Sequence, residues 1–412
     1  MGVCFYPSTE EGGPETLLRL ADHALYESKA HKNNRSRYWV VHGETVPQHR
    51  NLHQILLDEG AVEVYYQPII DGRSLRIVGV EALARLRGVD GCMIYPKEFL
   101  PRISNQHITK LSKIVLTQAL GDLGRLDQMG WPLEISFNFS PQSFNMECVT
   151  CLQDVIEGSG IVPSRITAEI LESDDFLERK RAVDIFNQLQ VIGIRIALDD
   201  VGSAYSSLLR LKELPIDKIK LDQGFICNLE KNPKDLHFVR ALQDLATELN
   251  VDLVVEGVET ADVLDAMLTI GVPYLQGYQI ARPLSFSQLK EFLQNHHISP
   301  PILPRGLFGY YAGTLASHAA LKKMIQINPK ELNLEALPDG KQCRGHDVMH
   351  RLGYTEGSRL VELHNRYHEK LGKVAGHGSA DISEWNSMEA VFSEFMAEIL
   401  SEWEKAPLSC AL

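Results

Sequence analysis

Short apolar runs alternate with longer amphipathic stretches between residues 44 and 299. Many of the stretches, such as LSKIVLTQALGDLGRLDQM, repeat their apolar residues with the period of a helix. This alternation predicts an α/β fold, and eight such strands are typical of a closed, TIM-like (β/α)8 barrel. The first two strands are joined by a short turn around DGRS, so one strand should run antiparallel. The candidate strands are VEVYYQPII, RIVGVEAL, LEISFNF, RITAEIL, IRIALDD, IDKIKL, VDLVVEG and PYLQGY.

The pattern changes after residue 299. The proline-rich segment PPILPRG should break the preceding helix, and little β-pattern follows it. Short loops join the helical stretches that come next, so residues 300–412 are predicted to form an all-α helical bundle. The stretches are LFGYYAGTLASHAALKKMIQI, GHDVMHRL, SRLVELHNRYHEKLGKVA and SEWNSMEAVFSEFMAEILSEW.

Polar side chains stand at the ends of the apolar runs or just past them. A carboxylate at the end of a buried strand is costly unless something positive meets it. Because the active site of a (β/α)8 barrel lies at the carboxyl ends of its strands, we expect these side chains to converge on one mouth. Such a mouth would suit divalent cations and an anionic substrate. The residues are Glu81, Asn138, Glu169, Asp199, Asp200, Lys220 and Glu256.

Composition narrows the choice of partners. The net charge of −13 argues against a nucleic-acid polymer or an anionic membrane as a general partner. It does not argue against a phosphate substrate, because bound cations can invert the local field. The 7 cysteines are odd in number and scattered, which favours free thiols over a disulfide framework. With no signal-peptide pattern and no apolar run near the ~18 residues of a membrane span, we expect a cytoplasmic protein.

Residues 60–295 resemble an EAL-type cyclic di-GMP phosphodiesterase domain over its whole length. Eight motifs of that family follow one another in the right order, which makes the resemblance very specific. It implies hydrolysis of one phosphodiester bond of cyclic di-GMP, giving linear pGpG, with Mg²⁺ or Mn²⁺ as cofactor. The motifs are Glu81-Ala82-Leu83 within GVEALAR, then YYQP, FNFSP, EILES, DDVGSAYSSL, IKLD, EGVET and QGY.

The resemblance also implies a role for each residue at the mouth. Two metal ions about 3.5–4 Å apart can clamp a phosphodiester and activate a water between them. Asp199 would bridge the two ions, and Asp200 would help to hold the second. Glu256 would bind or deprotonate the water, directly or through the second metal, while Lys220 would orient it and stabilise developing negative charge. The first metal would be held by Glu81, Asn138, Glu169 and Asp199.

Other residues of the same motifs have supporting or substrate roles by resemblance. Glu172 would pin the loop after Asp200, and Glu259 would play a similar supporting part. Arg85 stands four residues after Glu81 and should reach a phosphate oxygen. The residues expected to meet the guanine or ribose of one nucleotide are Gln67, Asp222, Gln276 and the region of Pro283.

The loop after the aspartate pair departs from the family pattern. That loop commonly reads DFGTGYSSL, whereas this chain has DVGSAYSSL, with Val201, Ser203 and Ala204. Alanine in place of glycine restricts the backbone, and in the family this loop supports metal binding and homodimer formation. Two alternatives to a working enzyme therefore stay open: a catalytically weak or inactive cyclic di-GMP receptor, and a scaffold whose helical tail sets its partners.

Residues 1–43 are too short for a domain of their own. Their helical stretch LADHALYESKAHKNN and the following RSRYWVV resemble the C-terminal end of a GGDEF diguanylate cyclase domain. The GGDEF loop itself does not occur in the sequence, so the resemblance implies no cyclase activity. A linker helix is the alternative reading.

The predicted bundle carries a second candidate constellation. His364 and His368 are four residues apart on one helix face and could chelate Zn²⁺ together. Cys343 and His318 would complete four N/S ligands, as in a closed structural or sensory zinc site. About residues 310–400 resemble the chemoreceptor zinc-binding (CZB) domain, which uses three histidines and one cysteine in this order. The resemblance implies zinc or oxidant control of the barrel through the Cys343 thiolate.

The segment around Cys343 departs from the CZB pattern. The CZB family usually has C-x-x-G-x-W, whereas CRGHDV places Gly345 one residue early and lacks the tryptophan. His346 and His350 are therefore competing ligands. The alternative to a zinc site is a set of surface or core histidines in a dimerising bundle.

Overall fold

The computed structural model describes residues 2–3, 40–41, 52–140, 146–171, 179–202, 214–296, 302–327, 340–377 and 382–406. Contacts divide the chain into two compact units. One unit comprises Met1–Glu63 and Ala84–Leu111, and the other comprises Val64–Leu83 and Ser112–Leu412. The GGDEF-like segment lies outside the described residues except for β1 (Gly2–Val3) and β2 (Val40–Val41), which pair in parallel.

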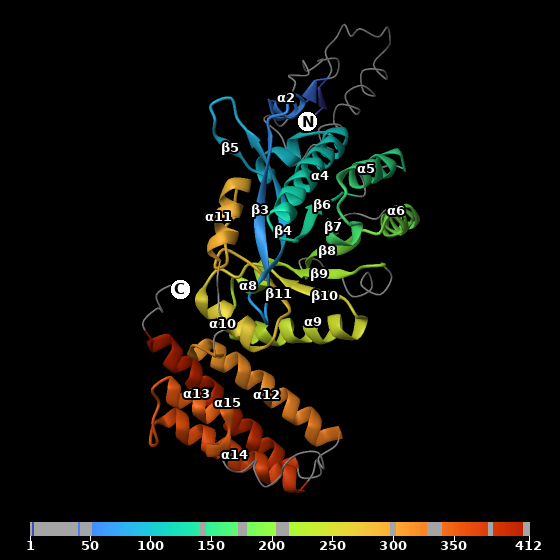
Figure 1. Ribbon diagram of the computed structural model, residues 1–412. Helices are drawn as coiled ribbons and strands as arrows, with labels where there is room; N and C mark the ends of the chain where they lie inside the picture. Colours follow the sequence, from blue (N-terminus) through green and yellow to red (C-terminus); the bar gives the residue numbers. More distant parts are fainter. Residues whose placement is uncertain are drawn as a thin grey trace. The chain divides into compact units, whose positions relative to one another are not determined.

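Eight strands close into a barrel, as the apolar runs predicted. Their order is β3-β11-β10-β9-β8-β7-β6-β4, and β3 also pairs with β4, which closes the ring (Figure 1). The neighbouring pairs from β4 round to β11 are parallel, whereas β3 runs antiparallel to β11. The single antiparallel strand of the barrel is therefore confirmed. The strands are β3 (Val62–Asp71), β4 (Ile77–Arg87), β6 (Glu134–Asn138), β7 (Ile166–Leu171), β8 (Arg195–Val201), β9 (Lys218–Leu221), β10 (Asp252–Val255) and β11 (Tyr274–Gln276).

The first unit adds a short strand that the sequence pattern did not predict. β5 (Met93–Ile94) pairs antiparallel with the end of β4 through Leu86 and Arg87. Helices α2 (Leu52–Asp58) and α3 (Pro96–Phe99) belong to the same unit. A two-residue strand carries too little periodicity to be seen in a sequence.

Amphipathic helices connect the barrel strands and run outside them (Figure 1). In α9, the buried residues Leu236, Val239, Leu242 and Ala246 recur every three or four positions and form its inner face. Asn250 ends this helix in the left-handed conformation, with φ of 55°. The helices are α4 (Asn105–Gln128), α5 (Met146–Ser159), α6 (Arg179–Ile192), α8 (Gln223–Ile226), α9 (Leu236–Leu249), α10 (Ala261–Thr269) and α11 (Phe286–Asn295).

The C-terminal part of the chain is helical, as predicted. It contains α12 (Leu307–Ile327), α13 (Arg344–Arg351), α14 (Arg359–His377) and α15 (Ile382–Lys405). α15 packs against both α12 and α14. Buried side chains from these helices, among them Leu315, Leu363 and Phe395, fill the space between them. Within the described segments, we find no helix whose length and apolarity would let it cross a membrane.

Helices α10 and α12 pack closely and join the bundle to the barrel core. Buried Asp265 of α10 accepts backbone N–H groups from Arg305 at 2.8 Å and Gly306 at 2.9 Å, just before α12 begins. Trp403 of α15 donates its indole N–H to Asp262 at 3.0 Å. One apolar cluster continues from the barrel strands through these helices into the bundle. The two parts therefore share a core rather than only a linker.

Gly309 of α12 provides a test of this packing. A Cβ at this position would lie 2.0 Å from Asp265 Oδ2. We expect Gly309→Ala to lower the free energy of unfolding by about 1–3 kcal/mol, because neither the helix nor the buried carboxylate can give way freely. Gly121→Ala in α4 is the matched control, since a Cβ there meets open space and should stabilise by about 0.5–1 kcal/mol. Equal urea midpoints for the two variants would contradict close packing of α10 on α12.

Candidate active site

The polar residues at the strand ends come together inside one end of the barrel. Strand register places Asn138 beside Glu169, and Glu81 beside Ser136. On the other side of the ring, Lys220 of β9 lies beside Val254 of β10, two residues before Glu256. The residues that are less than a tenth exposed are Glu81, Glu169, Asp199 and Lys220. The convergence predicted from the strand ends is therefore present.

Lys220 lies at the centre of this group. Its Nζ is 2.6 Å from Glu256 Oε1 and 2.9 Å from Glu169 Oε1. Two further carboxylates are close, Glu81 at 3.2 Å and Asp199 at 3.6 Å. Burial alone would lower the pKa of Lys220, but these carboxylates hold it well above its usual range. The lysine is therefore a permanent cation in a carboxylate-lined space.

The carboxylates carry more negative charge than one ammonium can balance. Burial and the nearby Glu81 charge raise the pKa of Glu169 well above its ordinary value. Burial, opposed by Lys220, raises the pKa of Glu256 to about 8, and burial with the Asp199 charge raises that of Asp200 to about 6. A cluster that resists ionisation in this way favours the binding of further positive charge. Its oxygen ligands are those that Mg²⁺ and Mn²⁺ prefer, so the donor set fits these ions.

The end of β8 lets two consecutive aspartates face the same space. Neighbouring residues of a regular strand point to opposite faces. Between Leu198 and Val201 the pairing of β8 with β9 shifts in register. Asp200 has φ of 56°, in the left-handed region that residues other than glycine rarely adopt. As a result, Asp199, Asp200 and Glu256 each offer an oxygen within 4.8 Å of the others. Such local strain is often found at functional sites.

Glu81 is held by amide donors as well as by the lysine. Gln276 donates from Nε2 to Glu81 Oε2 at 2.7 Å, and Asn138 donates to Oε1 at 3.3 Å. Burial would raise the pKa of Glu81, but Lys220 and these hydrogen bonds lower it below its ordinary value. Glu81 is therefore the carboxylate of the cluster that is most firmly held as an anion.

Comparison with known proteins identifies the barrel. The EAL domain family model matches residues 50–283. The chain belongs to the EAL domain family. An uncharacterized signaling protein of Caulobacter vibrioides is 34% identical over 69% of this chain and 35% of its own length. Cyclic di-GMP phosphodiesterase NbdA of Pseudomonas aeruginosa is 28% identical over 73% of this chain and 40% of its own length.

Solved structures agree with this assignment. The structure described as the PaMucR phosphodiesterase in complex with c-di-GMP has a TM-score of 0.54 and 31% sequence identity. It covers 58% of this chain and 99% of that one. The chain thus contains a whole EAL barrel, but spans only 35% and 40% of the length of the two curated relatives above.

The residues predicted to contact substrate are found in different settings. Gln67 donates to the backbone oxygen of Ala281 at 3.4 Å, and Asp222 caps α8 by accepting from Gly224 N at 2.9 Å. Pro283 is partly exposed shortly after β11. Buried Arg85 lies in the first unit, where its guanidinium stacks 5.0 Å from the centre of the Tyr95 ring. Gln276 was predicted to contact a nucleotide, and its amide also donates a hydrogen bond to the predicted metal ligand Glu81.

Two glutamates, Glu172 and Glu259, were predicted to support the cluster. Glu172 lies outside the described residues. Glu259 is exposed shortly after β10, and after burial its charge contributes to raising the pKa of the Cys227 thiol. Their proposed roles remain predictions.

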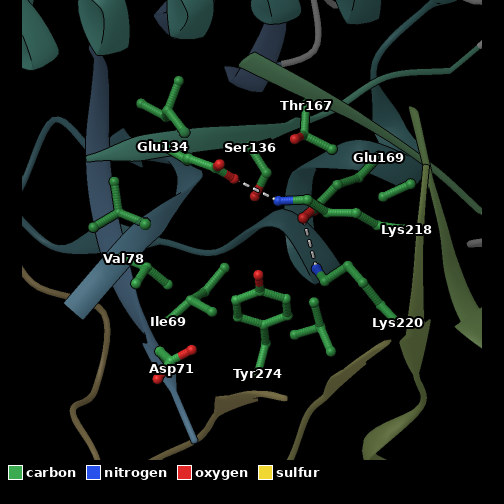
Figure 2. Close-up of a pocket in the computed structure, with 15 residues that line it drawn as sticks. Ile69, Asp71, Val78, Glu134, Ser136, Thr167, Glu169, Lys218, Lys220 and Tyr274 are labelled. Carbon is green, nitrogen blue, oxygen red and sulfur yellow. Dashed lines mark hydrogen bonds and ion pairs between the residues drawn. The ribbon is translucent and has the colours of Figure 1, made fainter. Parts of the chain in front are cut away.

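A second polar layer inside the EAL barrel was missed from the sequence. Figure 2 shows a pocket whose wall carries the Lys220–Glu169 pair and, separately, Lys218 bonded to Glu134. Lys218 Nζ lies 2.7 Å from Glu134 Oε2, and Arg195 also pairs with Glu134 at 2.9 Å. Lys218 begins β9 and Glu134 begins β6, so this layer belongs to the opposite end of the strands. The spacing of Lys218 and Lys220 was the available signal, since residues two apart share one face of a strand.

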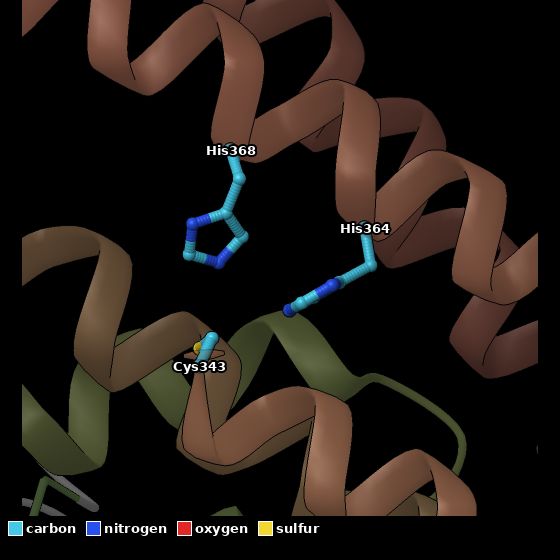
Figure 3. Close-up of side chains that lie close together, drawn as sticks. All are labelled: Cys343, His364 and His368. Atoms are coloured by element: carbon cyan, nitrogen blue, oxygen red, sulfur yellow. The ribbon is translucent and has the colours of Figure 1, made fainter. Parts of the chain in front are cut away.

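Three of the four predicted zinc ligands meet in the bundle. The ligand atoms of Cys343, His364 and His368 all lie within 4.8 Å of one another (Figure 3). Although burial opposes it, hydrogen bonds from both histidines lower the pKa of the Cys343 thiol to about 5. Gly345 leaves room for this group, because a Cβ there would lie 3.2 Å from His364 Nε2 and 3.5 Å from Cys343 Sγ. A thiolate and two imidazoles are a donor set that fits zinc.

His318 lines the same cavity but is turned to other partners. Its Nδ1 lies 2.9 Å from the Tyr367 hydroxyl, and its Nε2 lies 3.3 Å from Glu389 Oε1. Its ring stacks on Phe392 with centroids 3.6 Å apart, and burial lowers its pKa to about 4. The imidazole is therefore neutral and available as a ligand only after its ring turns.

The carboxylate excess gives a direct binding prediction. We expect Mn²⁺ at a hundred times its Kd to stabilise the chain by about 2.7 kcal/mol, and Asp199→Asn to remove most of this gain. Without metal, Asp199→Asn should be at least as stable as the parent, because one crowded carboxylate has become neutral. Glu157→Gln on the exposed face of α5 is the control. Thermal melting with and without Mn²⁺ makes the comparison, and an equal Mn²⁺ shift in the Asp199 variant would contradict metal binding here.

Proposed function

We propose that this chain is a metal-dependent phosphodiesterase that hydrolyses cyclic di-GMP to linear pGpG. The observation that carries the proposal is the group of buried carboxylates around Lys220 at the barrel mouth. NbdA, whose printed name is cyclic di-GMP phosphodiesterase, supports the choice of substrate. The neighbour PaMucR, described as a phosphodiesterase in complex with c-di-GMP, supports it further.

Two sets of ligands would hold two divalent cations. Asp199 belongs to both sets, and Asp200 would complete the second, where Glu256 also lies within 4.8 Å. When bound, the cations would withdraw charge from the phosphodiester and make a bound water more acidic. The first set would be Glu81, Asn138, Glu169 and Asp199.

The chain's own residues would position the water and handle its proton. Burial raises the pKa of Glu256 to about 8 in the metal-free protein, so its carboxylate is a stronger base than usual. Cations bound beside it would favour its ionised form, which is the form that accepts a proton. Its closeness to Asp199 and Asp200 favours action through the second metal rather than alone. Lys220, 2.6 Å from Glu256, would stabilise negative charge that develops on the phosphate.

Gln276 would act on a metal ligand in addition to its predicted contact with a nucleotide. Its 2.7 Å hydrogen bond would hold Glu81 Oε2, and the first cation would bind Oε1 in place of the 3.3 Å hydrogen bond from Asn138. The proposed substrate contacts remain Gln67, Arg85, Asp222, Gln276 and Pro283.

The two lysines of β9 offer a matched test of the activity. We expect Lys220→Met to lower kcat at least 100-fold, since removal of one group that stabilises transition-state charge costs about 10²–10³ in rate. Lys218→Met, two residues away in the second polar layer, should change the rate of pGpG release only a few-fold. Release is measured with cyclic di-GMP and Mg²⁺ or Mn²⁺, and melting temperatures check that both variants fold. Tight cyclic di-GMP binding without turnover by the parent protein would instead support the receptor alternative.

We also propose that the bundle binds one structural or sensory zinc ion and thereby regulates the barrel. Cys343, His364 and His368 would supply three ligands, and His318 would supply the fourth after turning from Glu389. Both His364 Nε2 and Cys343 Sγ approach the Cβ position of Gly345, so Nε2 is the nitrogen that would face the metal. The shared core of α10 and α12 gives the bundle a physical route to the barrel.

Zinc content tests this part of the proposal. The parent protein should retain close to one zinc per chain after dialysis, and Cys343→Ser should lose it, because a thiolate ligand is replaced by a weakly basic hydroxyl. Cys227→Ser removes an exposed free cysteine and serves as the control. Elemental analysis gives the ratio, and zinc retention by the Cys343 variant would refute the assignment.

A further inference from the structure

We propose a second, solvent-facing transition-metal site in the bundle, formed by His346, His350 and Glu356. The three residues each offer one ligand atom, and these atoms lie within 4.8 Å of one another. His346 is buried, whereas His350 and Glu356 are exposed. The site is therefore anchored in the bundle at one ligand and open to solvent at the other two.

Helix geometry brings the two imidazoles together. His346 and His350 are four residues apart on α13 and so share one face, and their Nε2 atoms are 3.0 Å apart. Their rings meet edge to face, with centroids 4.5 Å apart. Two nitrogens bound to zinc at about 2.0–2.1 Å in a tetrahedral arrangement would be roughly 3.3 Å apart. A small rotation of either ring is enough to reach that spacing.

The turn after α13 supplies the carboxylate. Gly353 and Gly357 both have positive φ, 91° and 93°, and lie in the turn that joins α13 to α14. This turn brings Glu356 Oε1 to 3.7 Å from His346 Nε2. Lys341 Nζ lies 3.5 Å from the same oxygen, but its side chain is 66% exposed. A metal would displace only a surface ion pair, which contributes little.

His346 is held inside the bundle, with its Nε2 toward His350. Its Nδ1 is buried and has no hydrogen-bond partner within the described parts of the chain. A hydrogen bond between the two Nε2 atoms uses one proton and one lone pair. A metal ion between them would instead take one lone pair from each Nε2. The present contact is thus the metal-free counterpart of a two-histidine chelate.

This site is distinct from the Cys343 group, although both are attached to α13. The two groups have no residue in common, and the His346 and His364 ring centroids are 6.1 Å apart. The open site has two nitrogens and one oxygen, with room for water. Such donors accept Zn²⁺, Co²⁺, Ni²⁺ or Cu²⁺ and release them more readily than a closed site with a thiolate. The two sites should therefore differ clearly in affinity.

Zinc titration of the full chain tests the proposal. The metal-stripped protein is titrated with Zn²⁺ alone by calorimetry, in millimolar Mg²⁺ to occupy the barrel. We expect His350→Ala combined with Glu356→Ala to lose the weaker of two zinc equivalents and keep the tighter one. Both changes are at exposed positions, so the fold should survive.

Two further variants sharpen the result. His237→Ala combined with Glu248→Ala removes an exposed histidine and glutamate from α9, and should leave both equivalents unchanged. Cys343→Ser combined with His368→Ala should keep the weaker equivalent, so failure of the buried zinc site would be seen separately. An unchanged isotherm for the His350/Glu356 variant would overturn the proposal. Loss of the tighter equivalent in that variant would also overturn it, because His350 would then serve the buried site.

Discussion

The crowding of buried carboxylates around Lys220 is the constraint on which the barrel mouth depends. Each buried ion loses hydration, and one ammonium cannot compensate five carboxylates. The side chains come from separate strands whose backbone hydrogen bonds tie them into a closed ring. No strand can move outward to reduce the repulsion without breaking its backbone hydrogen bonds to the neighbouring strands. The excess of buried carboxylates therefore favours the binding of cations. Without cations, the same burial and crowding raise the pKa values of Glu169, Glu256 and Asp200.

The irregular end of β8 converts a strand into a two-ligand element. A regular strand would send Asp199 and Asp200 to opposite faces. The register shift and the left-handed conformation of Asp200 make the end of β8 irregular, and as a result both carboxylates approach Glu256. The strained backbone at Asp200 therefore lies within the carboxylate cluster. Strain of this kind is common where a function needs side chains in an unusual position.

Helix α13 plays a comparable organising part in the bundle. Cys343 caps its first turn, while His346 and His350 lie along one face. One short helix thus carries donors for a buried thiolate group and for an open imidazole pair. Because the bundle and the barrel share a core through α10 and α12, a metal ion bound at α13 would be connected to the barrel by continuous packing.

Much of this could be predicted from the sequence alone. The apolar runs gave eight strands with bounds close to those observed, and their ends named Glu81, Glu169, Asp199 and Lys220. These predictions succeeded because strand periodicity and position at a strand end are local properties. A motif series also identified the family, which composition could not have done.

Tertiary structure decided which side chain meets which. Gln276 contacts Glu81 across 195 positions, because closure of the ring through β3 brings β11 near β4. The Glu134–Lys218 layer and the separation of His346 from the Cys343 group are likewise non-local. His318 has the right residue type for zinc but is turned to Tyr367 and Glu389. A sequence can specify donors and the elements that carry them, but partner choice depends on distances that exist only once the ring has closed and the helices have packed.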